Sequence, residues 1–312
     1  MPSKRKRATR AQADLQEIDA ALLLQSARKL PELDESGDKE SRGRVLVIAG
    51  SREMPGAAVL AGTAALRAGA GKLQIATPSS VAAHVGAAVP EARVFALPET
   101  MKGDADASSV RLIAEQIAGA SAILVGPGMA DERAASLLVG QIVRHIRHIR
   151  DATLVVDANA LNALKANPWL LHGLARTPIL TPHAEEMSEL TGESSDELKR
   201  NALHVLARTA DELRAVIALK GRETFVTAQK QKTCFVNRAG NVGLATSGSG
   251  DVLAGLVAGL AARGAEPLNA ALWGVHVHAL AGERLAHRVG RVGYLARELL
   301  AEIPSVLMEL GG

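Results

Sequence analysis

The chain of 312 residues has little cysteine and few aromatic side chains. Its single cysteine, Cys234, excludes an intramolecular disulfide and a zinc site built from several thiolates, and it fits a reducing compartment. Three Phe, two Trp and one Tyr are too few for a surface on which nucleic-acid bases stack. No uncharged apolar run approaches the ~18 residues that span a bilayer, and the first apolar segment is too short for a signal peptide. We therefore expect a cytoplasmic protein that binds neither nucleic acid nor membrane.

The N-terminal segment contains both basic and acidic residues, and the whole chain has a formal net charge of only +3. The basic run from Lys4 to Arg7 could be a nuclear-localisation or nucleic-acid patch, but a solvated arm is the simpler interpretation. Four apolar residues have the spacing of one short amphipathic helix: Leu15, Ile18, Leu22 and Leu23. Pro31–Lys39 is typical of a charged linker. We predict an N-terminal arm over residues 1–41 and a domain over residues 42–312, with order beginning at Arg42–Gly43.

From Arg44 onward, short apolar runs alternate with longer segments of helical period. The apolar runs predict seven strands: Val45–Ala49, Lys72–Thr77, Arg93–Leu97, Ala122–Val125, Thr153–Val156, Thr177–Leu180 and Ala215–Leu219. The segments between them predict helices, among them Ala57–Arg67, Val110–Ile117, Arg133–Arg147 and Ser195–Arg208. This alternation predicts an α/β fold with a mostly parallel central sheet and helices on both faces. Thr224–Thr227 and Thr233–Val236 predict an antiparallel hairpin at one edge, and the chain after Asp251 is expected to be helical.

Small and polar residues follow five of the predicted strands. In order they are Gly50-Ser51, Gly126-Pro127-Gly128, Asp157-Ala158-Asn159, Thr181–Glu186 and Lys220–Thr224. Each could simply be a turn, since Gly and Pro also end strands. In an open parallel sheet, however, all of these turns lie on the rim where ligands bind. Their number favours an enzyme site at this rim.

The segment Thr246–Asp251 (TSGSGD) has the strongest chemical signal. Glycines allow a phosphate to approach the backbone, and free amides at a helix start donate hydrogen bonds to it, which predicts an anion hole at Gly248, Ser249 and Gly250. Asp251 would be either a base aimed at the site or, with Ser249, a simple helix cap. Gly255 and Gly259 lie one turn apart, so the following helix can pack tightly and hold Asp251 rigidly.

Lys220–Thr224 (KGRET) is the second candidate segment. A lysine at a strand end, a glycine and a nearby threonine hydroxyl suit a nucleotide phosphate or ribose, whereas the structural alternative is a β-turn with solvated charges. There is no GxxxxGK[ST] segment and no GxGxxG after the first strand, which excludes a P-loop and counts against an ordinary dinucleotide-binding dehydrogenase.

His183, Glu185 and Glu186 form the third candidate. One histidine without a thiolate makes zinc improbable, and acidic residues after Pro182 also suit the first turn of a helix at Ala184–Leu190. A carboxylate that holds Mg²⁺ through water is compatible with both interpretations. Two further histidine pairs are assigned no chemistry: His145 with His148, on a solvated face, and His276 with His278, on different sides of a helix.

Taken in order, these motifs resemble those of the ADP/ATP-dependent NAD(P)H-hydrate dehydratases, a branch of the ribokinase-like enzymes. The resemblance extends over about residues 42 to 310 and rests on five motifs: AGSxxMPGAA at Ala49–Ala58, GPG at Gly126–Gly128, TPHxxE at Thr181–Glu186, LKGxxT at Leu219–Thr224 and GSGDVLAG at Gly248–Gly255. It implies a ribokinase-like fold. Many family members carry an N-terminal epimerase domain; about 40 residues precede the match here, which implies a stand-alone dehydratase that depends on a separate epimerase. The family also implies a homo-oligomer.

The resemblance also implies roles for individual residues. Ala57, Gly128 and His183 match positions that contact the hydrated nicotinamide nucleotide, and Asp251 matches the acidic position that touches substrate and acts as base. Six positions match those that contact the adenosine phosphate: Lys220, Gly221, Arg222, Glu223, Thr224 and Gly250. Glu186 is the carboxylate that we expect to hold Mg²⁺ through water. Three residues depart from the family pattern, namely Asn159, Glu185 and Ser247.

The implied reaction is dehydration of (6S)-NAD(P)H hydrate (NADHX or NADPHX) back to NAD(P)H, with ADP as the expected donor in preference to ATP. Two alternatives remain open from the sequence. A ribokinase-like kinase acting on a vitamin precursor or a sugar would use the same GSGD segment. A non-catalytic nucleotide-binding protein would be expected to have a broken GSGD or KG segment, and both are intact here.

Overall fold

A ten-stranded sheet forms the centre of the described part of the chain (residues 14–32, 37–149 and 151–311) in this computed structural model. The strand order is β1-β10-β9-β8-β7-β6-β5-β2-β3-β4, and within the described residues β9 alone runs antiparallel to its neighbours. The bounds are β1 (Asp14–Glu17), β2 (Arg44–Ile48), β3 (Lys72–Pro78), β4 (Arg93–Leu97), β5 (Ala122–Val125), β6 (Thr153–Val156), β7 (Ile179–Leu180), β8 (Val216–Leu219), β9 (Thr224–Ala228) and β10 (Thr233–Asn237). The predicted α/β fold with a mostly parallel sheet is confirmed, and so is the β9–β10 hairpin towards one edge.

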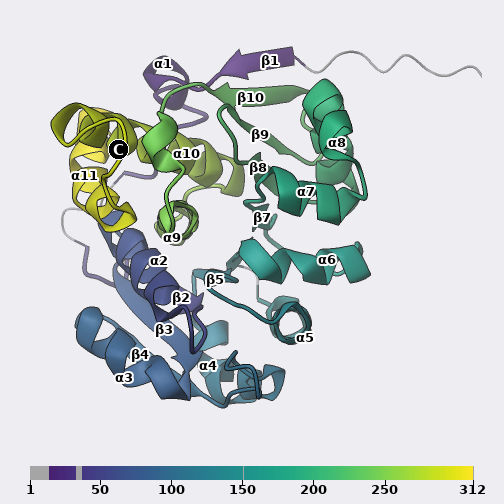
Figure 1. Ribbon diagram of the computed structural model, residues 1–312, viewed down its shortest axis with the longest axis vertical. Coiled ribbons are helices and arrows are strands. Elements are labelled where there is room, and N and C mark those ends of the chain that lie inside the picture. Colours follow the sequence, from purple (N-terminus) through teal and green to yellow (C-terminus); the bar gives the residue numbers. More distant parts are fainter. Residues whose placement is uncertain (1–13, 33–36, 150, 312) are drawn as a thin grey trace, which may run out of the picture.

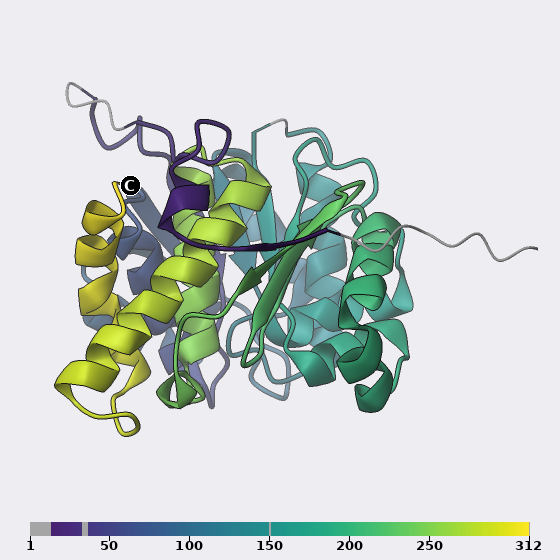
Figure 2. The same cartoon turned by 90° about the horizontal axis from the view of Figure 1, so that it is seen from above.

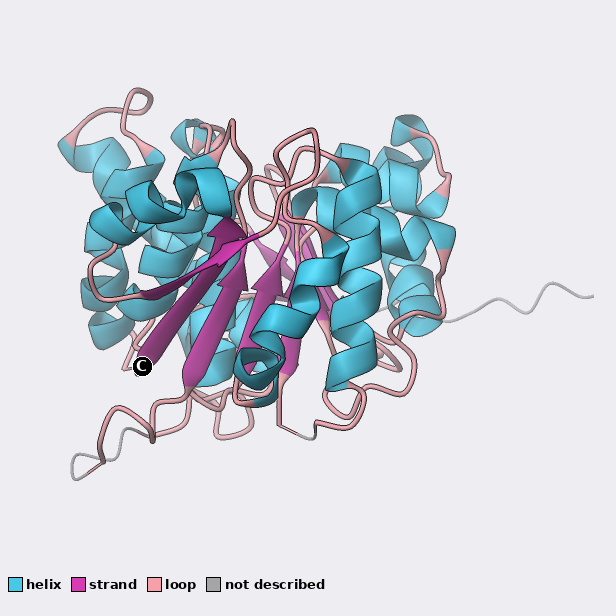
Figure 3. Ribbon diagram, turned by 90° about the horizontal axis from the view of Figure 1, so that it is seen from below, coloured by secondary structure: helices cyan, strands magenta, loops and turns pink. Residues whose placement is uncertain are grey.

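Helices cover both faces of the sheet (Figures 1 and 3). One face carries α1 (Ala20–Leu23), α2 (Pro55–Arg67), α3 (Ser79–Ala88), α9 (Ser249–Ala262), α10 (Pro267–Arg288) and α11 (Ala296–Glu309). The other carries α4 (Ala114–Ala118), α5 (Glu132–Ile146), α6 (Asn162–Ala166), α7 (Ala184–Thr191) and α8 (Ser195–Leu213). No helix among the described residues is both long enough and apolar enough to cross a bilayer.

Successive strand residues serve two separate cores. In β2, Val45 and Val47 join the core under α2 and α9, whereas Leu46 and Ile48 join the core under α5. Alternation of this kind, with both sets apolar, is what a parallel strand buried on both faces requires. The continuous apolar runs in the sequence thus become the sheet's two buried faces.

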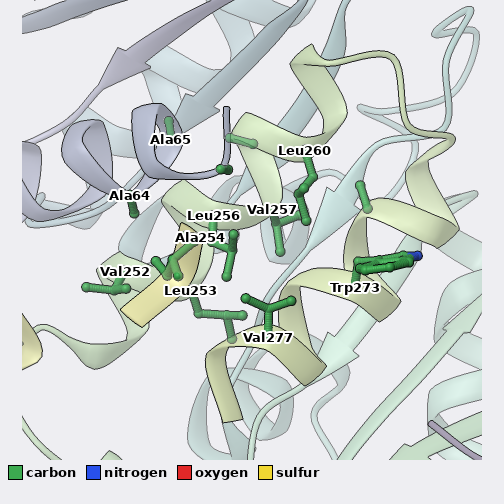
Figure 4. Packing of buried hydrophobic residues seen from close by; sticks show 14 of the residues in the cluster. Ala64, Ala65, Val252, Leu253, Ala254, Leu256, Val257, Leu260, Trp273 and Val277 are labelled. Atoms are coloured by element: carbon green, nitrogen blue, oxygen red, sulfur yellow. The ribbon is translucent and has the colours of Figure 1, made fainter. Parts of the chain in front are cut away.

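Helix α9 lies between α2 and α10 and approaches α2 at backbone distance (Figure 4). A Cβ atom added at Gly255 would overlap the carbonyl oxygen of Ala61 and lie 2.7 Å from its Cα. At Gly259 it would lie 2.5 Å from the Ala65 oxygen. Both glycines are therefore required by close helix packing, as the sequence predicted.

The structure contradicts the predicted amphipathic helix near the N-terminus. Asp14–Glu17 forms β1, which pairs in parallel with the free edge of β10 (Figure 2), and only Ala20–Leu23 is helical. Order also begins before Arg42, because the apolar side chains of Ile18, Leu22, Leu23 and Leu30 are buried in the core beside α10. An unpaired strand edge elsewhere in the chain decided this pairing, and local periodicity carries no information about such an edge. The basic run Lys4 to Arg7 lies outside the described residues, so for residues 1–13 the arm predicted over residues 1–41 stays a prediction.

Three further elements differ in extent from their predicted bounds. The strand expected at Thr177–Leu180 shortens to β7. The helix expected at Val110–Ile117 is a 3-10 segment at Ala107–Ile113 followed by α4, since the Asp106 carboxylate accepts from Ser108 N at 2.8 Å and starts the turn early. Helix α8 runs on to Leu213 but is kinked at Asn201, where φ is −130°.

Candidate active site

The five turns predicted to share one rim follow β2, β5, β6, β7 and β8, which are neighbours in the sheet. The chain builds outward from β2 in one direction to β4 and then restarts at β5 on the other side, so a topological switch point lies between β2 and β5. Ligands of open α/β sheets bind beside such a point. Gly50 N donates to Pro127 O at 2.8 Å and joins the two turns there.

Ala57 and Gly128, predicted to contact substrate, are in contact at this switch point. Gly128 has φ +68°, and a Cβ added there would lie 2.5 Å from the Cβ of Ala57. A side chain at residue 128 would therefore push into the first turn of α2. Asn159, one of the departures from the family pattern, donates to Met129 O at 2.9 Å and holds the segment that follows.

A buried ion pair lies at the ends of β6 and β8. Asp157 is 2% exposed, and its Oδ1 accepts from Lys220 Nζ at 2.8 Å and from Thr181 Oγ1 at 2.7 Å. Burial alone would lower the pKa of Lys220, but the carboxylates of Asp157 and Glu186 raise it above its ordinary value. The lysine therefore stays charged beneath the Gly250 turn, where a Cβ at Gly250 would lie 3.5 Å from Nζ.

Asp251 lies in the first turn of α9, and it does not cap that helix. The N-cap is Gly248, with φ +87°, so the interpretation of Ser249 or Asp251 as a simple cap is wrong. Burial, reinforced by the negative charge of Asp157 and partly opposed by Lys220, raises the pKa of Asp251 to about 7. A carboxylate with a pKa near neutrality can accept a proton and release it again, which is what a general base needs.

His183 and Glu186 form a capping box at the start of α7. His183 Nδ1 accepts from Glu185 N and Glu186 N at 3.1 and 3.2 Å, and Glu186 Oε2 accepts from His183 N at 2.7 Å. Burial raises the pKa of Glu186, although the neighbouring Lys220 opposes the shift. The helix start expected at this segment is thus confirmed. The His183 side chain is nevertheless 48% exposed, and Glu186 Oε2 lies 3.9 Å from Lys220 Nζ.

A cavity of about 1120 Å³ opens beside Gly248–Gly250, the predicted anion hole, which we call the anion turn. Its lining includes the whole Lys220–Thr224 segment together with Ser249, Gly250 and His183. Gly248, Asp251, Ala57 and Gly128 are not part of the lining. The structure therefore brings the predicted nucleotide-binding residues to one cavity together with His183, whereas Ala57 and Gly128 lie at the switch point between β2 and β5.

Two residues of the site were missed by sequence reasoning. Asp157 was noted only as a turn residue, although a buried strand that ends in Asp is itself a signal. His278 was assigned no role, yet it is buried and lines the cavity, with Nε2 at 3.1 Å from both Ser249 Oγ and Ser249 O. The alternation His276-Val277-His278 in an otherwise apolar helix was the available signal.

The model of the NAD(P)H-hydrate dehydratase family matches residues 45–305. The chain belongs to this family. It is 46% identical over 274 residues to a Xanthomonas campestris protein named ADP-dependent (S)-NAD(P)H-hydrate dehydratase, covering 88% of this chain and 91% of that one. It is 37% identical to the bifunctional NAD(P)H-hydrate repair enzyme of Moorella thermoacetica, of which it covers 52%.

One solved structure belongs to the same family, and another supports the fold. The Bacillus subtilis ADP/ATP-dependent NAD(P)H-hydrate dehydratase, co-crystallized with ATP/Mg²⁺, superposes with a TM-score of 0.78 at 29% identity, covering 95% of this chain and 98% of that one. A ribokinase-like protein from Enterococcus faecalis superposes with a TM-score of 0.80 at 24% identity, which supports the fold alone. The ribokinase-like fold expected for this dehydratase-family chain is confirmed.

Proposed function

We propose that this protein dehydrates (6S)-NAD(P)H hydrate to NAD(P)H at the expense of ADP, which yields AMP and phosphate. The single observation that carries the proposal is the buried Asp251, with a pKa of about 7, at the start of α9 and next to a nucleotide-sized cavity. Membership of the dehydratase family favours this reaction over the small-molecule kinase alternative, which would stop at a phosphorylated product.

The bond to be broken joins C6 of the ring to a hydroxyl, and hydroxide is a poor leaving group. Asp251 takes the proton of that hydroxyl, and the oxygen attacks the β-phosphoryl group of ADP, with AMP as leaving group. The C6–O bond then breaks with release of phosphate. The ring nitrogen lone pair assists, and a proton is lost from the adjacent carbon, so that NAD(P)H is restored.

The start of α9 is suited to bind the transferred phosphoryl group. Gly248 is the N-cap of α9 and Ser249 and Gly250 open its first turn, where the helix dipole is positive. Ser249 N already donates to Thr246 O at 3.2 Å, which leaves the amides of Gly248 and Gly250 as the backbone donors for a phosphoryl oxygen. Developing charge on the phosphoryl oxygens would be stabilised there without reorganisation of the protein. Lys220, fixed by Asp157, adds a positive charge below the same turn.

Mg²⁺ fits the residues at the rim as an ion shared with the nucleotide. No group of three or more His, Cys, Asp or Glu side chains within the described residues forms a ready-made metal site, and Mg²⁺ commonly needs only one or two carboxylates plus phosphate oxygens and water. Glu186 is the carboxylate that would hold it through water. When bound, the ion would neutralise charge on the donor phosphates.

The remaining residue roles rest on the family resemblance. Ala57, Gly128 and His183 would contact the hydrated nicotinamide nucleotide, while Gly221, Arg222, Glu223 and Thr224 would contact the adenosine diphosphate. We further propose a cytoplasmic homo-oligomer that depends on a separate epimerase, because its substrate is one of two C6 epimers.

The decisive experiment follows the absorbance of the reduced nicotinamide ring after hydrated NADPH or NADH is mixed with protein, Mg²⁺ and either ADP or ATP. Recovery that requires ADP, with AMP and phosphate released in equal amounts, is the expected result. Binding of nucleotide without recovery of NAD(P)H would contradict the dehydratase proposal and favour the kinase, which is then tested by phosphorylation of vitamin precursors and sugars.

A further inference from the structure

His278 makes a polar contact that ties α10 to the start of α9. It lies in the middle of α10 and is 9% exposed, and Ser249 is 4% exposed. The Nε2 atom lies 3.1 Å from the Ser249 carbonyl oxygen and 3.1 Å from its hydroxyl oxygen. Both residues line the nucleotide cavity.

The chemistry of these partners determines the direction of the hydrogen bonds. A backbone carbonyl oxygen only accepts, so the Nε2 atom must carry the hydrogen. Burial lowers the pKa of His278 to about 4, so the ring is neutral and this is its single N–H. The hydroxyl oxygen of Ser249 therefore also accepts from this N–H group, and the hydroxyl hydrogen points elsewhere.

We propose that His278 is a positioning residue that orients the Ser249 hydroxyl as a hydrogen-bond donor to a phosphate oxygen of the nucleotide in this cavity. The inference rests on the proposed nucleotide-dependent function. It adds a side-chain donor to the backbone amides of the anion turn, and it predicts that loss of the imidazole weakens binding of phosphate through Ser249.

Helix α10 also makes hydrogen bonds to two other residues of the cavity lining, Asn237 and Gly240. His276 Nδ1 lies 2.9 Å from Asn237 Oδ1, and Glu283 Oε1 accepts from Gly240 N at 2.8 Å. His276 is as deeply buried as His278, and its side-chain hydrogen bond is with Asn237 and not with Ser249. It therefore serves as a matched control for the loss of a buried imidazole.

The test compares Ser249→Ala, His278→Leu, His278→Gln and His276→Leu, alone and combined with Ser249→Ala. Calorimetry gives the dissociation constants of ADP and of adenosine, which lacks phosphate. Ser249→Ala and His278→Leu should each weaken ADP binding by about tenfold, the effect of one hydrogen bond to a charged group, and leave adenosine binding unchanged. His278→Gln keeps a donor near the Nε2 position and should restore most of the affinity.

The combined variants decide the proposal. His278→Leu should add little to Ser249→Ala, whereas any effect of His276→Leu should add fully. Multiplicative losses for Ser249→Ala and His278→Leu, or equal losses for ADP and adenosine, would overturn the inference. If His278→Leu does not fold, the same comparison is made with His278→Asn, whose shorter side chain cannot reach Ser249 as glutamine does. Because ADP binding is measured without the hydrate, failure of wild type to restore NAD(P)H overturns the proposed function alone, and failure of wild type to bind ADP overturns the inference.

Discussion

Two helices of this protein, α9 and α5, begin beside an aspartate, and the two carboxylates behave in opposite ways. Asp131 is the N-cap of α5, and its Oδ1 accepts from Arg133 N at 3.0 Å and from Ala134 N at 3.4 Å. Partial burial would raise its pKa, but these N–H groups and Lys102 lower it overall. Asp251 follows a glycine N-cap and has a pKa raised to about 7. A carboxylate that caps a helix is committed to its backbone, and one withheld from the cap is available for proton transfer.

The two helices also differ in how they are packed. Helix α9 contacts the backbone of α2 through Gly255 and Gly259, whereas Gly140 of α5 has no other atom within 4 Å of a Cβ position. The helix that carries the reactive carboxylate is therefore the one with no room for adjustment. Rigid support of this kind keeps a functional group within the narrow geometry that catalysis requires.

The largest effect is expected from Asp251→Asn. Loss of a positioned base costs typically ~10²–10⁴-fold in rate, so kcat should fall by that order while ADP still binds. Asp131→Asn keeps an oxygen that can cap α5, and its kcat should stay near the wild-type value. Steady-state recovery of NAD(P)H measures both, and an active Asp251→Asn would remove Asp251 as the base.

Gly255→Ala should have the next largest effect, a loss of stability. The new Cβ would overlap the Ala61 carbonyl, and overpacking of this kind costs about 1–3 kcal/mol. The free energy of unfolding from urea denaturation measures the loss. A variant as stable as wild type would show that α9 and α2 can move apart.

The pH dependence separates the two aspartates. Since the base must be deprotonated, kcat/KM should rise with pH through about 7. Asp157→Asn removes the negative charge that helps to raise the pKa of Asp251, so the rise in kcat/KM should occur at lower pH. A rise at the same pH as in the wild type would mean that Asp157 does not influence the base.

The same shift affects stability. The folded pKa of Asp251 lies above its ordinary value of 3.8, so the folded state binds the proton more tightly. The free energy of unfolding should therefore decrease as pH rises from about 4 to about 7. Asp251→Asn should lose this dependence, which thermal unfolding at a series of pH values detects.

The smallest expected effect is a gain in stability. Gly140→Ala replaces a glycine in the middle of α5 where nothing hinders a Cβ, and it should stabilise the protein by about 0.5–1 kcal/mol. Thermal unfolding compares the stability of this variant with that of Gly255→Ala. A stability change of the same sign for both substitutions would contradict the difference in packing between the helices.

Much of the site was predictable because it is encoded locally. Turn residues after apolar runs marked the rim, and Ser249–Asp251 before an apolar helix marked the anion turn. The pairing of Asp157 with Lys220 could not be predicted, because the two residues are 63 positions apart and meet only when β6, β7 and β8 are placed side by side. For the same reason β1 was mistaken for helix, since its partner β10 lies more than 200 residues away.

The sequence by itself determined the alternation of strands and helices, the polar rim and the glycines that α9 needs, because each depends on the conformational preferences of neighbouring residues. The tertiary structure alone decided which charges are buried together and which histidine touches the anion turn. Burial and contact depend on the residues that surround a group in space, and for Asp251 these are Asp157 and Lys220, from distant strands. The pKa that makes Asp251 a suitable base is thus a property of the fold.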